Sequence, residues 1–219
     1  MPISILYVYR SFFPYTRDGG PNISSKNIVE LLSKRDISVK VLTSKGLPEF
    51  ELKKNEIDFG KKHFMSQGIE IEYIGSAMKA DPRLAYLVLK ESKNKITHIN
   101  GIWASYFFAS FLKGLVSDHS FLISPRGMFM KGSLSQGKNS LKKVFVEALK
   151  PFMNHFFWHV TSEQEKQELE ELKVKSEQIF YIPNPVALET VAEKQPQKKG
   201  FLFLRKNRYC CCHFVHFHA

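Results

Sequence analysis

The stretch "KITHINGIWASYFFASFLKGLVSDHSFLISP" (95–125) decides the fold class of this 219-residue chain. Residues 95–100 and 120–125 are short apolar runs of strand length, and the apolar spacing over 103–115 predicts a helix between them. Two buried strands joined by one helix are typical of a parallel βαβ unit. The stretch therefore predicts an α/β domain.

The same alternation continues on both sides of this unit. Upstream, we expect strands at 3–9, 37–44 and 69–75 and helices at 22–35 and 82–94. Downstream, we expect helices at 140–153 and 163–173 and strands at 156–162 and 178–184. Residues 45–68 are lysine-rich and predict an irregular excursion. Together these elements predict a doubly wound, mainly parallel, Rossmann-like sheet.

The charge of the chain limits its partners. A formal net charge of +11 favours nucleic acid, a phosphorylated ligand or an anionic membrane face, although a lysine-rich surface that only maintains solubility explains it equally well. The basic residues are dispersed and match no nucleic-acid-binding motif, so we expect no nucleic-acid partner. No apolar run approaches ~20 residues and no signal peptide is recognisable, so we expect a cytoplasmic location.

Candidate site residues follow the predicted strands. Gly19 and Gly20 lie between the first strand and a helix, where glycine backbone and free N–H groups suit a phosphate; a plain turn is the alternative. His98 and Asn100 end the strand at 95–100, where ligands of open α/β sheets bind. His98 is a candidate acid, base or hydrogen-bond donor beside a sugar hydroxyl, and a histidine satisfied by neighbouring backbone is its alternative.

Two further segments carry basic residues. Arg126 and Lys131 lie in a glycine-containing loop after the strand at 120–125, where arginine suits a phosphate or carboxylate; a solvated basic loop is the alternative. The helical stretch 138–153 mixes lysines with apolar residues and suits an anionic membrane surface. The alternative is a helix that packs on the core and exposes a basic side to solvent. Thr161 or Ser162 is expected to cap the next helix.

The last ten residues, "CCCHFVHFHA" (210–219), hold all three cysteines of the chain and three of its eight histidines. Zinc ligands are normally spaced so that one tetrahedral ion can be reached without strain. Three adjacent cysteines do not provide that spacing, and no second cluster completes a cage. We therefore expect no metal site.

Six segments in succession resemble the N-terminal half of a family 4 glycosyltransferase with the two-domain GT-B fold. They are "DGGPNISSKNIVELLSKRDISVKVLTS", "THINGIW", "SPRGMF", "LKK", "HVTSEQE" and "IPNPV", and the resemblance covers roughly residues 3–188. It implies transfer of a sugar from a nucleotide-diphosphate donor to a polysaccharide or lipid-linked glycan precursor. It also implies no metal and no cofactor, with peripheral contact to the inner face of the plasma membrane.

The resemblance assigns roles to the candidate residues. Gly19 and Gly20 would approach the donor diphosphate, and His98 would be the catalytic residue near the reacting sugar. Arg126 and Lys131 would face the cleft on the donor side. The acceptor side would include Asn100 and Trp103.

The family pattern also sets the expected domains. Residues 1–188 would form the N-terminal, acceptor-side domain and 189–200 a linker. "KKGFLFLR" (198–205) resembles the strand that opens the donor domain, whose arginine, here Arg205, grips the diphosphate; the glycine before that arginine is missing. Residues 201–219 would be an aberrant remnant of a truncated donor domain. We therefore expect no transfer by this chain alone, and the alternative is a non-catalytic module that binds an acceptor, a membrane or a partner.

Overall fold

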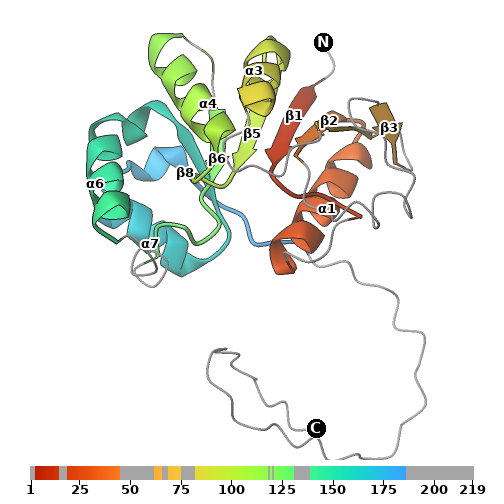
Figure 1. Ribbon diagram of the computed structural model, residues 1–219. Coiled ribbons are helices and arrows are strands. Elements are labelled where there is room, and N and C mark those ends of the chain that lie inside the picture. Colours follow the sequence, from red (N-terminus) through yellow and green to blue (C-terminus); the bar gives the residue numbers. More distant parts are fainter. Residues whose placement is uncertain are drawn as a thin grey trace, which may run out of the picture. The chain divides into compact units, whose positions relative to one another are not determined.

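The computed structural model describes residues 3–14, 19–44, 62–65, 69–74, 82–117, 119, 121–130 and 139–185 (Figure 1). Within them, eight strands form one sheet in the order β3-β4-β2-β1-β5-β6-β7-β8. The strands are β1 (Ser4–Tyr9), β2 (Ser38–Thr43), β3 (Lys62–Phe64), β4 (Glu70–Tyr73), β5 (Ile96–Asn100), β6 (Phe121–Ser124), β7 (Phe157–Val160) and β8 (Ile179–Tyr181). Every described pairing is parallel except that of β3 with β4. The predicted mainly parallel, Rossmann-like α/β fold is confirmed.

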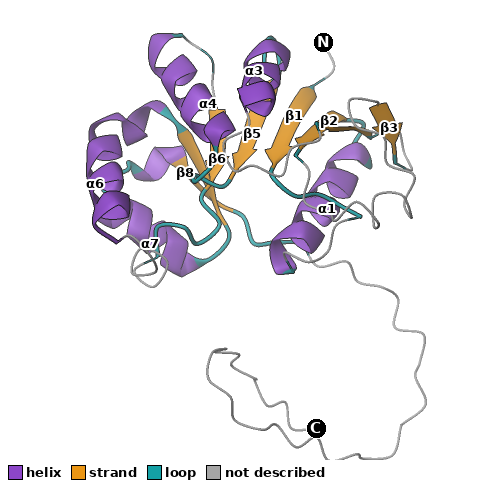
Figure 2. Ribbon diagram, in the orientation of Figure 1, coloured by secondary structure: helices purple, strands orange, loops and turns teal. Residues whose placement is uncertain are grey.

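The helices alternate with these strands (Figure 2). They are α1 (Gly20–Ser33), α3 (Pro82–Glu91), α4 (Ser105–Val116), α6 (Asn139–Leu149) and α7 (Glu163–Glu171), with short 3-10 helices η1 (Lys150–His155) and η2 (Ser176–Gln178). None of the helices in the described part of the chain is both long enough and apolar enough to cross a membrane.

Two elements differ in kind from the prediction. Strand β3 lies inside 45–68, where we expected no regular element, and its three residues pair antiparallel with β4. The helix expected at 140–153 is an α-helix only to Leu149 and continues as the 3-10 helix η1. Pro151 explains this change, because its ring nitrogen has no hydrogen for the next α-helical bond.

The two faces of the sheet are covered by different helices. Helix α1 packs on one face, where Val29 joins a buried cluster with Tyr7, Val41 and Ile71. The remaining helices pack on the other face, around a larger cluster that includes Trp158. The chain therefore winds outward from β1 in both directions, and the carboxyl ends of β1 and β5 lie side by side at the point where the direction reverses. Ligands of open α/β sheets bind at such a switch point.

Candidate functional site

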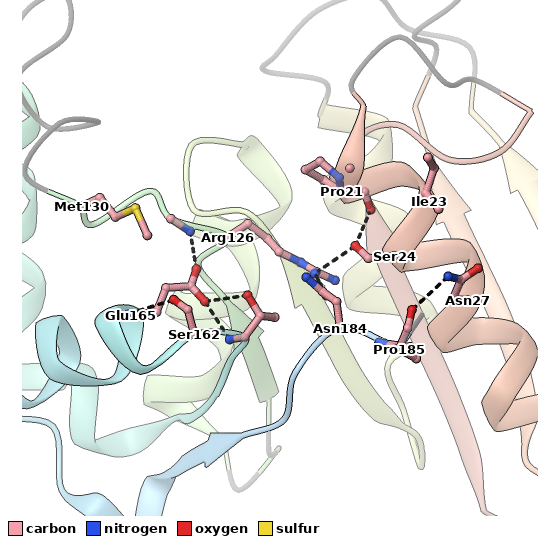
Figure 3. Close-up of a pocket in the computed structure, with 13 residues that line it drawn as sticks. Pro21, Ile23, Ser24, Asn27, Arg126, Met130, Ser162, Glu165, Asn184 and Pro185 are labelled. Carbon is pink, nitrogen blue, oxygen red and sulfur yellow. Dashed lines mark hydrogen bonds between the residues drawn. The ribbon is translucent and has the colours of Figure 1, made fainter. Parts of the chain in front are cut away.

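A cavity of about 540 Å³ lies at the carboxyl end of the sheet (Figure 3). Its walls come from the N-terminus of α1, the loop after β6, the start of α7 and the segment after β8. The side chains that matter below are those of Ser24, Arg126, Glu165 and Asn184. We call this cavity the Arg126 pocket.

Five hydrogen bonds, all to uncharged side chains, hold the Arg126 guanidinium. Its Nε and Nη2 donate to Asn100 Oδ1 at 3.1 and 2.9 Å, and Nη2 also donates to the Tyr7 hydroxyl at 3.1 Å. On the pocket side, Nη1 donates to Asn184 Oδ1 at 2.8 Å and to Ser24 Oγ at 3.3 Å. Among the described residues no carboxylate lies within ion-pair distance of Arg126, although the Glu165 carboxylate lines the same pocket. This geometry suits an anionic ligand. Its oxygens would replace Asn184 Oδ1 and Ser24 Oγ at Nη1 and form charge-assisted hydrogen bonds there.

Two buried side chains fix the inner side of Arg126. Asn100 ends β5 and is fully buried, and its Nδ2 donates to the Val8 carbonyl at 3.3 Å. Tyr7 of β1 is also fully buried, and its hydroxyl lies 2.9 Å from Ser25 Oγ of α1. Burial raises the pKa of Tyr7, so the hydroxyl keeps its proton. These contacts make Asn100 and Tyr7 positioning residues for Arg126.

The loop that carries Arg126 is tied to α7 by a buried carboxylate. Arg126 itself has a left-handed backbone with φ of 54°. One oxygen of Glu165 accepts from the Gly127 backbone N–H, and the other accepts from the Thr161 N–H at 2.7 Å and the Thr161 hydroxyl at 2.9 Å. Ser162 caps α7 by accepting from the Glu165 N–H at 3.2 Å, which confirms the predicted cap. Glu165 therefore holds the loop after β6 as well as the first turn of α7.

The N-terminus of α1 forms the opposite wall. The helix begins at Gly20, two residues earlier than predicted, and Gly19 precedes it with φ of 66°. A Cβ on Gly19 would meet nothing within 4 Å, so this position favours glycine through its backbone conformation rather than through space. No side chain caps the helix, and Gly20 lines the pocket. An uncapped helix N-terminus favours anions.

His98 lies elsewhere. It does not line the Arg126 pocket but a smaller, mainly apolar cavity of about 240 Å³ beneath α1. Its Nε2 lies 2.8 Å from Ser124 Oγ, which lies 2.8 Å from His159 Nδ1. His159 Nε2 is 3.0 Å from the Ile182 carbonyl, which can only accept, so this nitrogen carries a proton and Nδ1 accepts from Ser124. His98 Nε2 then donates to Ser124, and a catalytic role for His98 stays a prediction.

Acidification is expected to destabilise the fold through this pair. Burial lowers the pKa of His98 and of His159 below the ordinary value of 6.5, so both are neutral in the native state. The unfolded chain then binds more protons than the native state below pH ~6.5, so stability falls as the pH is lowered from ~7 to ~5.5. Urea unfolding across this range measures the slope of stability against pH, which His159→Gln should reduce. A flat profile of stability against pH in the unmodified chain would contradict the expectation.

The structure brings together only some of the predicted site residues. Gly20 and Arg126 line the pocket, and Gly19 precedes it. Asn100 lies behind Arg126, whereas Trp103 is half-buried against Phe145, with ring centroids 5.1 Å apart. Lys131 and Arg205 lie outside the described residues, as do 189–200 and 201–219.

Four residues of the site are not among those predicted from the sequence. They are Tyr7, Ser24, Glu165 as a loop anchor, and Asn184. For Asn184 a signal was present, because "IPNPV" was recognised as a segment of the family pattern without a role for its asparagine. Within the described ranges, no group of three or more His, Cys, Asp or Glu side chains could hold a metal ion.

Comparison with known proteins gives a structural likeness only. No protein-family model matches the chain, and no curated protein matches it in sequence. Among solved structures, sucrose-phosphate synthase from Thermosynechococcus elongatus is similar, with a TM-score of 0.56 and 14% sequence identity over 83% of this chain and 48% of that one. The chain thus spans about half the length of that protein. At this identity the likeness shows the fold and not the activity.

Proposed function

We propose that the chain is the acceptor-side domain of a cytoplasmic glycosyltransferase that moves a sugar from a nucleotide-diphosphate donor onto a polysaccharide or lipid-linked glycan precursor. The Arg126 pocket carries this proposal. An arginine with no carboxylate partner among the described residues and an uncapped helix N-terminus face one cavity at the switch point of the sheet. Phosphate oxygens are the ligands that both features favour.

In the proposed reaction Arg126 acts on the diphosphate. A phosphate oxygen in the pocket would take the place of Asn184 or Ser24 at Nη1, and a bond to an ionised oxygen is about twice as strong as a neutral one. Negative charge grows on the diphosphate as the bond to the sugar breaks. A guanidinium already fixed by Asn100 and Tyr7 stabilises that charge without reorganising.

The structural likeness supports sugar and phosphate chemistry by analogy. The name of the matched protein, sucrose-phosphate synthase, denotes an enzyme that makes a sugar phosphate. Because this chain spans about half of that protein, sugar transfer is proposed for a two-domain enzyme in which the described residues form one wall of the cleft.

A non-catalytic binding module is the second candidate. The described domain forms the Arg126 pocket by itself, from four of its own segments. Such a pocket binds a phosphorylated ligand whether or not transfer follows.

Calorimetry and a transfer assay test both candidates. The 219-residue chain is titrated with uridine diphosphate, with inorganic pyrophosphate and with unphosphorylated uridine. We expect both diphosphates to bind and uridine not to bind, and we expect no transfer of labelled sugar from nucleotide-diphosphate sugars by this chain alone. Absence of binding by either diphosphate would contradict both candidates. Transfer by the chain alone would contradict the assignment to one side of a cleft.

A further inference from the structure

The cavity beneath α1 that His98 lines is a second candidate binding site, and we call it the His98 cavity. Its walls are apolar side chains from α1, β1, β5, β6 and the segment after β8, together with the imidazoles of His98 and His159. Among the described residues no carboxylate, lysine or arginine lines it. A charged ligand would therefore be buried there without a counter-charge, so the cavity suits an uncharged one.

The cavity is reached from solvent past three partly exposed side chains. Leu31 of α1 is 46% exposed, Ile96 at the start of β5 is 49% exposed, and Ile182 after β8 is 55% exposed. An apolar molecule in the cavity removes part of this surface from water, which favours binding. The mouth of the cavity therefore selects for apolar ligands.

One buried nitrogen gives the cavity a polar feature. His98 is 5% exposed, and its Nε2 donates to Ser124 Oγ at 2.8 Å, so Nδ1 carries the lone pair. Within the described part of the chain, the hydrogen bonds of His98 are made at Nε2, and no donor reaches Nδ1. Burial lowers the pKa of His98, so Nδ1 is unprotonated near neutral pH. A buried acceptor without a donor is unfavourable, and a ligand that donates a hydrogen bond removes this cost.

The imidazole of His98 is held in place before any ligand binds. The Tyr7 ring packs against it edge to face, with ring centroids 5.0 Å apart. The His159 ring lies 5.3 Å away on another side, and its Nε2 donates to the Ile182 carbonyl at 3.0 Å. A ligand that bonds Nδ1 therefore has little side-chain ordering to offset.

We propose that the His98 cavity binds a small, uncharged, apolar molecule that carries one hydroxyl group and has the size of a substituted phenol. The volume supports this size, because an apolar cavity of ~150 Å³ holds benzene and this one measures about 240 Å³. The hydroxyl group donates to His98 Nδ1, and the ring contacts the apolar walls. Arg126 does not line this cavity, so the proposal stands independently of the proposed function.

Titration with p-cresol and with toluene tests the proposal. The two molecules differ only in the hydroxyl group, and backbone amide shifts of the 219-residue chain report their dissociation constants. We expect both to bind, p-cresol about fivefold more tightly because it alone donates to Nδ1. Equal binding of the two would show that Nδ1 accepts no hydrogen bond from the ligand. Absence of binding by either, as when another segment of chain fills the cavity, would also overturn the proposal.

Matched variants locate the ligand. Leu31→Trp places a larger ring at the mouth of the cavity and should weaken binding of both molecules on the order of tenfold. Leu112→Trp, at an exposed leucine of α4 on the opposite face of the sheet, should leave both unchanged. Both positions are exposed, so these variants are expected to fold. If Leu31→Trp binds both molecules as well as the unmodified chain, the ligand lies elsewhere and the proposal is wrong.

His98→Phe isolates the hydrogen bond. It should remove the preference for p-cresol and leave binding of toluene within about twofold, because the ring remains and the acceptor nitrogen is lost. Circular dichroism verifies that this buried variant folds, and if it does not fold, the Leu31→Trp and Leu112→Trp pair decides the location. A folded His98→Phe variant that still prefers p-cresol would contradict the assigned contact.

Discussion

Arg126→Gln is expected to weaken binding of uridine diphosphate and pyrophosphate by on the order of 100-fold. The reason is that the pocket loses a charge for which no counter-charge lies within ion-pair distance among the described residues, and each hydrogen bond to a charged group contributes ~1.5–3 kcal/mol. Arg126→Lys should recover only part of this loss. The ammonium group of lysine lacks the planar fork of N–H groups with which arginine bonds Asn100 and Asn184 at the same time. Calorimetry of the three proteins measures the series.

Arg35→Gln is the matched control for this series. Arg35 is exposed and follows the far end of α1, the helix whose N-terminus lines the pocket. Its replacement removes the same charge from the chain, so it corrects for long-range attraction of the anion. If Arg126→Gln and Arg35→Gln bind pyrophosphate equally well, the anion does not use Arg126 and the proposed site is wrong.

Much of the fold could be predicted because buried parallel strands are apolar along their whole length. "SILYVY" and "FLIS" are such runs, and they form β1 and β6. β3 could not be predicted, since "KHF" has no apolar alternation and forms a strand only by pairing with the outer edge of β4. Pro151 indicates the early end of α6, whereas the apolar periodicity continues across 140–153 and favours one longer helix.

The site residues that could be predicted are those that follow the end of a strand. Arg126 and Gly20 follow strand ends, and parallel strands bring their ends to one edge of the sheet. The partners of Arg126 were not predictable, because Tyr7 lies 119 residues away in sequence and Asn184 lies 58 away. His98 illustrates the same limit: its strand end was found, but its contact with Ser124 depends on the register of β5 against β6.

Glu165→Gln is expected to lower the free energy of unfolding by about 2–3 kcal/mol. Its carboxylate is buried and accepts three hydrogen bonds, from Gly127 and Thr161. Glutamine has one acceptor oxygen, so its amide group would face a backbone N–H and leave that buried donor without an acceptor. The melting temperature should fall by roughly 5–10 °C, measured by circular dichroism.

Glu163→Gln separates this loop-anchoring effect from the general effect of a negative charge at a helix N-terminus. Glu163 lies in the same first turn of α7, but its side chain is 56% exposed and contacts Lys166 at 3.6 Å. Its replacement should change stability by less than ~0.5 kcal/mol.

Glu165→Gln should also weaken pyrophosphate binding about tenfold, because the loop that carries Arg126 loses its tie to α7. Equal melting temperatures for the two variants would show that the Glu165 carboxylate does not hold this loop, and the rigid placement of Arg126 would then need another cause.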